Sequence, residues 1–308
     1  MELFKYRAFG LTIQSDIEFS ELADEAFLSK AIDLKIETTN LGVEIPNLTE
    51  AEPFIDFEAP DGVTMVWPGA AAIRIRSNQH VEVQKYPNVP ENYMAFPILG
   101  PVMGWILHQR GKLVLHSSAV VIDDVSFAFL GDKMAGKSTT ASAFLRNGAK
   151  LITDDLLVID INDGAVPTVQ PSFAQLKLNE NSAEHVSPPD SHALPLVMEG
   201  FEKRQYRLET MVSKTVPLDA CFILRRCSET PQIEWLSSSD ALKFLIRFSY
   251  FVRFGSAPSQ YQERALHFKN CVTLTQHTQF GILNIPASLN ELDKTVEVLR
   301  NEMRRRLI

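Results

Sequence analysis

The sequence has few cysteines, and their spacing excludes two common structural roles. Cys221, Cys227 and Cys271 are odd in number and form no CxxC pair. Such spacing suits neither a disulfide framework nor a structural zinc site, and it is typical of a protein kept in a reducing compartment. We therefore expect a cytoplasmic location and no cysteine-based scaffold.

The sequence also lacks a long hydrophobic run. The N-terminus has no continuous apolar stretch behind its first lysine, so it is not expected to be a secretory signal. The most apolar segment, residues 94–107, has about 14 residues, fewer than the roughly 18 needed to cross a bilayer. It contains Pro97 and Pro101. The sequence predicts a buried, kinked helix here and no association with a membrane.

A surplus of positive charge is likewise absent. The formal net charge is −8, which argues against a general affinity for nucleic acid while leaving a local basic site open. The 308 residues, 45% hydrophobic and 22% charged, suffice for one large domain or two modest ones with a hydrophobic core.

Two regions differ in their hydrophobic pattern. Residues 1–110 predict a β-rich, antiparallel N-terminal region that ends in the apolar helix, because short alternating segments are separated by Pro and Gly. The expected strands are 4–14, 33–37, 63–67, 72–76 and 81–84. Sequence does not decide whether this region docks a peptide or is only a structural flank.

Residues 111–308 predict strands alternating with helices. Apolar strands are expected at 113–122 and 126–130, followed by a helix from Lys137 to about Asn147 that ends at Gly148. Further expected elements are strands at 150–153, 156–161 and 216–225, a mobile loop or lid at 179–200, and helices at 240–251 and 288–307.

One octet matches the phosphate-loop pattern G-x-x-x-x-G-K-[ST] in full, between an apolar strand and a helix. The glycines allow a tight backbone turn, Lys137 would neutralise the β- and γ-phosphates, and the Ser138 hydroxyl would ligate Mg²⁺. The expected nucleotide contacts are Gly131, Asp132, Lys133, Met134, Ala135, Gly136, Lys137, Ser138 and Thr139.

Two adjacent carboxylates, Asp154 and Asp155, end the apolar strand at 150–153. A phosphate-loop site needs a carboxylate for Mg²⁺, and a second one would accept the proton of an attacking hydroxyl. The alternative is an ordinary turn between strands, where Asp is common. His116, on the strand before the loop, is a third candidate, although a lone histidine is more often structural.

The segment 115–155, LHSSAVVIDDVSFAFLGDKMAGKSTTASAFLRNGAKLITDD, resembles the core of the HPr kinase/phosphorylase superfamily. The shared pattern is a Leu-His step, a strand, the octet, a helix ending in Gly and a strand ending in Asp-Asp. The resemblance implies an α/β fold with a mixed sheet, related to phosphoenolpyruvate carboxykinase. It also implies Mg²⁺ at Ser138 and Asp154, Asp155 as general base, and His116 near the phosphates.

The opening KYRAFGLTIQSDIEFSEL is similar to the start of HPr-kinase-related proteins encoded beside peptide-modification genes. That branch includes kinases that phosphorylate the C-terminal residue of lasso-peptide precursors. The glycine-rich signature of bifunctional HPr kinase/phosphorylases is missing, and residues 199–205 read EGFEKRQ instead. This departure argues against HPr as substrate and against phosphorolysis. Lys203 and Arg204 are candidates for extra phosphate contacts, or else an exposed basic pair that begins a strand.

These features together predict a kinase that uses ATP and Mg²⁺, with residues 111–308 as its nucleotide-binding catalytic domain. The expected partner is a peptide or protein with an acceptor hydroxyl, such as the C-terminal serine of a precursor peptide. Two alternatives stay open: a nucleotide-binding regulatory protein without transferase activity, and a kinase for a small molecule or for HPr. The sequence also leaves open whether the protein is a homo-oligomer.

Overall fold

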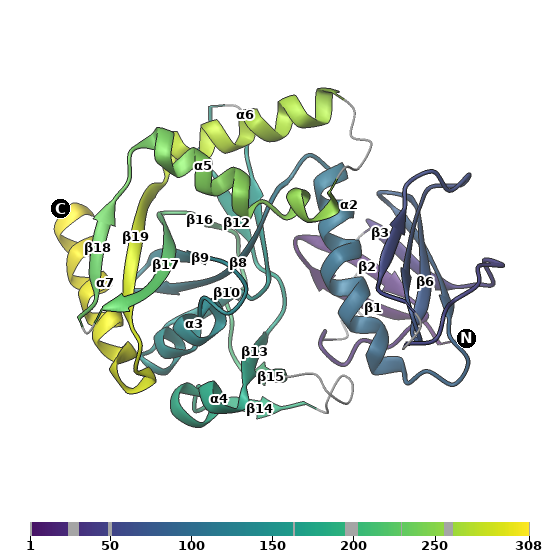
Figure 1. The fold of residues 1–308 in the computed structure, drawn as a ribbon, viewed down its shortest axis with the longest axis horizontal. Coiled ribbons are helices and arrows are strands. Elements are labelled where there is room, and N and C mark those ends of the chain that lie inside the picture. Colours follow the sequence, from purple (N-terminus) through teal and green to yellow (C-terminus); the bar gives the residue numbers. More distant parts are fainter. Residues whose placement is uncertain are drawn as a thin grey trace.

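The computed structural model describes residues 2–23, 31–48, 51–162, 164–194, 203–228, 230–255 and 261–307. The chain forms a mixed α/β structure with a seven-stranded sheet, a nine-stranded sheet and a small three-stranded sheet. An apolar helical segment lies between the two large sheets (Figure 1). No helix in the described ranges combines the length and apolarity needed to cross a membrane.

The N-terminal sheet has the strand order β1-β2-β3-β7-β6-β5-β4. Its strands are β1 (Phe4–Ala8), β2 (Leu11–Ser15), β3 (Leu34–Thr38), β4 (Phe54–Asp56), β5 (Val63–Trp67), β6 (Ala71–Ser77) and β7 (His80–Lys85). The single strand expected at 4–14 is instead a hairpin, because Phe9 and Gly10 both adopt positive φ (55° and 76°) and reverse the chain. The expectation of a purely antiparallel sheet is also wrong, because β3 runs parallel to β2 and to β7.

The helical segment 91–109 is kinked, as its prolines predict. It consists of η1 (Glu91–Met94), α1 (Ala95–Pro97), the π-helical turn η2 (Ile98–Val102) and α2 (Met103–Gln109). Pro101 lies inside η2, where its missing N–H interrupts the α-helical hydrogen bonds. Its buried side chains join one core with the N-terminal sheet and with Val114 and Val158 of the second sheet. The hydrophobic core therefore crosses the boundary expected at residue 110.

The nine-stranded sheet has the order β16-β12-β11-β8-β9-β17-β19-β18, with β10 also paired to β8. Strands β9, β17 and β19 are mutually parallel, and the other neighbours are antiparallel. The bounds are β8 (Leu113–Ile122), β9 (Val125–Leu130), β10 (Lys150–Thr153), β11 (Leu156–Asp160), β12 (Thr168–Gln170), β16 (Val216–Pro217), β17 (Ala220–Ser228), β18 (Gln232–Trp235) and β19 (Gln279–Pro286).

Helices cover both faces of this sheet. On one face, Phe127 and Phe129 of β9 pack with α3 (Lys137–Arg146) and α7 (Leu292–Leu307). The alternate residues Ala128 and Leu130 face α5 (Ser238–Phe248) and α6 (Tyr261–His277), as the two-residue period of a strand requires. Figure 1 shows α3 and α5/α6 on opposite sides of the sheet. The loop after β9 is therefore held at the edge of a rigid, doubly covered sheet.

Several expectations for this region need correction. The described part of the loop expected at 179–200 contains α4 (Glu180–Val186) and β14 (Ser191–Ala193), while 195–200 lie outside the described residues. The strand expected at 216–225 is split into β16 and β17. The helix expected at 240–251 ends at Phe248, and the 3₁₀ turn η3 (Tyr250–Phe254) follows. The three-stranded sheet consists of β13 (Gln175–Asn179), β15 (Lys203–Leu208) and β14.

Candidate functional site

The octet 131–138 forms the loop between β9 and α3, with Gly136 as the N-terminal cap of the helix. Gly136 has φ = 96°, a left-handed conformation that glycine adopts without strain. A Cβ at this position would lie 3.1 Å from Nη2 of Arg226. Met134, at the tip of the loop, also has a positive φ of 69°. The backbone is thus tightly turned directly before the positive end of the α3 dipole, a geometry suited to an anion.

Lys137 folds back over this loop. Its Nζ donates hydrogen bonds to the carbonyl oxygens of Gly131 (2.9 Å) and Asp132 (3.0 Å). The residue is only 8% exposed, and burial lowers the pKa of its ammonium group to about 8. The lysine is held where a phosphate on the loop would meet it.

Asp154 lies at the end of β10, with 8% of its surface exposed. Its Oδ1 accepts hydrogen bonds from the hydroxyls of Ser138 (3.0 Å) and Ser118. Its Oδ2 accepts one from the backbone N–H of Lys177 at 2.9 Å. Burial, followed by the neighbouring charge of Asp155, raises the pKa of Asp154. Ser138 and Asp154 therefore bring two hard oxygen ligands together at the start of α3.

Asp155, the next residue, has a positive backbone φ of 73°. Its Oδ2 accepts a hydrogen bond of 2.5 Å from Nζ of Lys177. Burial alone would raise the pKa of Asp155, but the ammonium group of Lys177 outweighs it and the pKa falls well below its usual range. The same pairing raises the pKa of Lys177 against the effect of burial. The pair is therefore a carboxylate and an ammonium ion.

His116 lies beside the same aspartate, because β8 pairs with β11 at the register His116↔Leu156. Its Nδ1 is 3.1 Å from the carbonyl oxygen of Asp155. Since a carbonyl can only accept, Nδ1 carries the proton of this hydrogen bond. Burial lowers the pKa of His116 to about 3. The imidazole is thus neutral near pH 7, with Nε2 left as the unprotonated nitrogen.

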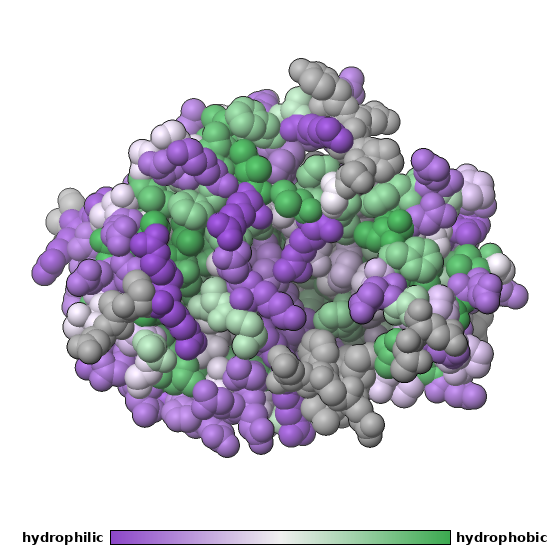
Figure 2. All heavy atoms as spheres, in the orientation of Figure 1, coloured by the Kyte–Doolittle hydropathy of each residue, from purple (hydrophilic) through white to green (hydrophobic). Residues whose placement is uncertain are grey.

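A cavity of about 660 Å³ connects these groups. Figure 2 shows the face between α3 and α2 as hollowed and bordered largely by hydrophilic side chains. Among the residues that line the cavity, Asp155 is the one acidic side chain, whereas six are basic. They are Lys133, Lys137, Lys177, Lys203, Arg226 and Arg253. Although the chain as a whole has a net charge of −8, the lining of this cavity is positively charged. Such an arrangement attracts polyanions.

Most of the residues expected at a nucleotide site meet here. The lining includes Lys133, Met134, Gly136, Lys137, Ser138, Thr139, Asp155, His116 and Lys203. Asp154 lies beneath the lining, held by Ser138 and Ser118. Gly131 and Ala135 shape the loop, since a Cβ on Gly131 would lie 2.7 Å from that of Ala135.

Besides Gly131 and Ala135, two further expected contacts, Asp132 and Arg204, are not among the lining residues. The exposed Arg204 sits beside Lys203 on β15, and its Nε donates to the carbonyl oxygen of Leu194 at 3.1 Å. Successive side chains of a strand point to opposite faces, so the pair is divided, with Lys203 toward the cavity. The Asp132 side chain forms an exposed ion pair with Arg247 at 2.8 Å.

Other residues of the cavity gave no sequence signal. Lys177, Arg226, Tyr250, Arg253 and Phe96 come from four separate segments. The alternation in 175–179 predicts that Lys177 faces away from its apolar neighbours, but not that this face meets Asp155. Tyr250 and Arg253 belong to η3, a turn that begins where α5 ends earlier than expected. These residues become recognisable only when the fold brings them together.

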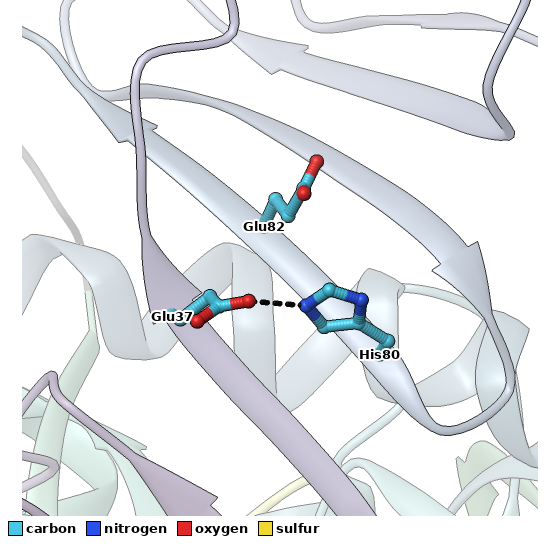
Figure 3. A group of neighbouring side chains, drawn as sticks. All are labelled: Glu37, His80 and Glu82. Carbon is cyan, nitrogen blue, oxygen red and sulfur yellow. Dashed lines mark hydrogen bonds and ion pairs between the residues drawn. The ribbon is translucent and has the colours of Figure 1, made fainter.

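A second acidic cluster, Glu37, His80 and Glu82, is the group of possible metal ligands found among the described residues. Figure 3 shows Glu37 directed at the His80 ring, with the Glu82 carboxylate turned away from both. Lys35 lies 2.6 Å from Glu37, and Arg76 lies 2.7 Å from Glu82. These cations already neutralise the carboxylates, so the cluster is an ion-pair network on β3, β6 and β7.

The fold and the site define a mixed α/β protein in which a glycine-lysine loop, paired aspartates and a basic cavity lie together. A comparison with protein-family models finds no match, and a comparison with curated proteins finds none either. Among solved structures, this chain is similar to the HPr(Ser) kinase/phosphatase from Coxiella burnetii, at 11% sequence identity. The alignment covers 64% of this chain and 99% of that one, with a TM-score of 0.33.

Proposed function

We propose that this protein is an ATP-dependent kinase that transfers the γ-phosphoryl group to a hydroxyl of a peptide or protein. The supporting observation is the hydrogen bond of 3.0 Å between Ser138 and Asp154. It joins the end of the glycine-lysine loop to the paired aspartates, with Asp155 and Lys137 facing one cavity. Loop, metal ligands and base are the parts that phosphoryl transfer from a nucleotide requires.

The residues present fit a bound Mg²⁺. Hydroxyl and carboxylate oxygens are its preferred protein ligands, and Ser138 and Asp154 would hold it directly or through water. Burial and the charge of Asp155 raise the pKa of Asp154, and a divalent cation beside it would offset both effects. The ion would supply charge neutralisation between the β- and γ-phosphates.

The chain's own residues would act by position and charge. Lys137 and the loop amides hold the β- and γ-phosphates. The acceptor oxygen forms a bond to the γ-phosphorus while the bond from that phosphorus to the bridging oxygen breaks, and ADP leaves with the electron pair. The hydroxyl proton passes to the Asp155 carboxylate. Most of the acceleration would come from holding these groups in line in a basic cavity.

The proposed acceptor is a peptide hydroxyl, such as the C-terminal serine of a precursor peptide, including a lasso precursor. The cavity of about 660 Å³ is within the size range of small-molecule sites. Apolar groups line the side contributed by the helical segment, namely Phe96, Gly100 and Pro101, and would contact the acceptor chain.

The test is transfer of radiolabel from γ-labelled ATP to a peptide library, with the product site found by mass spectrometry. Asp155→Asn is expected to abolish transfer and largely retain ATP binding. Lys137→Ala is expected to abolish transfer as well. The matched control is Asp160→Asn, which removes another largely buried carboxylate that is ion-paired to a lysine but lies outside the cavity lining.

Three outcomes would change the proposal. Full activity in Asp155→Asn would remove this residue from the base role. Nucleotide binding with neither transfer nor hydrolysis would favour a regulatory protein. Transfer to metabolites or to HPr, and to no other peptide, would favour the remaining alternatives.

A further inference from the structure

Lys177 makes contacts in the site that a merely structural lysine would not need. It lies on β13, and 16% of its side chain is exposed, toward the cavity. Its backbone N–H binds Asp154 and its Nζ binds Asp155. The ammonium group also lies 5.6 Å from the centre of the Phe96 ring, which belongs to α1. Lys177 thus connects both aspartates to the opposite wall of the cavity.

Stability alone gives a poor reason for this placement. Removing an ammonium group from water costs several kcal/mol, which a buried ion pair often fails to repay. By contrast, the neighbouring residues of the same strand, Leu176 and Leu178, are buried apolar side chains, which carry no such desolvation cost. A charge kept in an enclosed, functional cavity is more often part of its chemistry.

The distances place Nζ beside the point of transfer. A hydroxyl activated by Asp155 must lie within about 3 Å of that carboxylate, and the phosphorus within about 3.5 Å of the hydroxyl. Lys177 Nζ is 2.5 Å from Asp155 Oδ2. The ammonium group therefore lies close to where the hydroxyl and the phosphoryl group would be. It also occupies one of the two carboxylate oxygens that an acceptor hydroxyl could use.

We propose that Lys177 is a further catalytic residue, which leaves Asp155 and pairs with the transferred phosphoryl group. This inference rests on the proposed kinase function. Negative charge spreads over the equatorial oxygens of the phosphoryl group during transfer. Lys137 meets that charge from the loop side, and Lys177 meets it from the aspartate side. Its departure frees Asp155 Oδ2 to accept the hydroxyl proton, while the phosphorus–oxygen bonds exchange as described above.

The test compares affinity for ADP with affinity for ADP plus aluminium fluoride and Mg²⁺, a mimic of the transferring group. In Lys177→Met we expect ADP affinity to stay within about threefold, because the proposed ADP contacts lie on the loop 131–138. Analogue affinity and kcat should fall by about 10²–10³-fold. Lys177→Arg should recover part of both losses. A structural role would weaken ADP and analogue equally.

Lys112→Met is the matched control, because Lys112 also pairs with a largely buried aspartate, Asp160, but does not line the cavity. It should leave the ratio of analogue to ADP affinity unchanged. If Lys177→Met does not fold, the same change is made in the Asp155→Asn background, where no ionised carboxylate loses its partner. There too we expect the analogue to bind more weakly than to Asp155→Asn alone.

The outcomes separate this inference from the kinase proposal. Equal loss of ADP and analogue affinity, or kcat within about threefold of wild type in Lys177→Met, would overturn the role of Lys177. If wild-type protein transfers phosphate to no acceptor, the kinase proposal fails, and analogue binding still tests Lys177. If wild-type protein binds neither ADP nor the analogue, both proposals are overturned.

Discussion

Acidification is expected to destabilise this protein through one buried histidine. His108 of α2 is 9% exposed, and its Nε2 has no hydrogen-bond partner among the described residues. Its ring stacks on Phe251, with centroids 4.3 Å apart, and lies 6.0 Å from the ring of His267. Burial, and then the proximity of His267, lower the pKa of His108 to about 4. The folded protein therefore holds this imidazole neutral.

The size of the effect follows from the difference between the two states. In the unfolded chain the histidine has its ordinary pKa of 6.5, and in the folded protein the pKa is about 4. Between these values the unfolded state binds more protons, so stability falls as pH falls, by about 1.4 kcal/mol for each pH unit. The contribution is intact above about pH 6.5 and is lost progressively down to about pH 4, a total of roughly 3 kcal/mol.

Urea unfolding of wild type and His108→Phe, compared from about pH 7.5 to about pH 4.5, measures the contribution of His108 to the pH dependence of stability. Phenylalanine keeps a ring against Phe251 and cannot titrate, so the variant should gain stability relative to wild type as pH falls. His277→Gln, which changes an exposed histidine, should show no such gain. A constant difference between wild type and His108→Phe across this range would refute the reasoning.

Two glycine positions give further tests. Gly136→Ala places a Cβ at φ = 96° and 3.1 Å from Arg226; we expect a strain of about 1–2 kcal/mol and at least roughly tenfold weaker ATP binding by calorimetry. Unchanged affinity would mean that the loop backbone does not hold the phosphates. Gly104→Ala would bring a Cβ to 2.4 Å from the Tyr250 ring. It should cost about 1–3 kcal/mol in urea unfolding, unlike Gly100→Ala, where a Cβ meets nothing within 4 Å; equal losses would refute the close contact.

The part of the site that sequence predicts well is local in the chain. His116 and Asp154 lie on neighbouring segments, because β10 and β11 both pair with β8. The loop joins β9, the hairpin partner of β8, to α3. Strand–loop–helix geometry and short hairpins follow from apolar period, glycine position and a helix cap. A motif contained in such a unit can therefore be placed from sequence.

The remaining part depends on pairings between distant segments. Lys203 and Arg204 are equivalent in sequence, and what separates them is which face of β15 meets the cavity. That face is set by the pairing of β15 with β13, Lys203 opposite Asn179 and Arg204 opposite Leu178. The same pairing of β13 with β15 also positions Lys177. No local pattern encodes a register between strands so far apart, because period alone fixes alternation and not the partner.

The N-terminal region is better understood as part of the frame of the site than as a detachable module. The Phe9 N–H donates to the carbonyl oxygen of Pro171 at 3.0 Å, and the Phe9 ring meets that of Phe173 edge-on at 5.8 Å. These contacts hold residues 171–173, which lead directly into β13, the strand whose Lys177 binds Asp155. From the other side, Phe96 packs over the same lysine. Because one hydrophobic core includes the N-terminal sheet, the helical segment and β11, displacing the sheet would disturb the cavity at two walls at once.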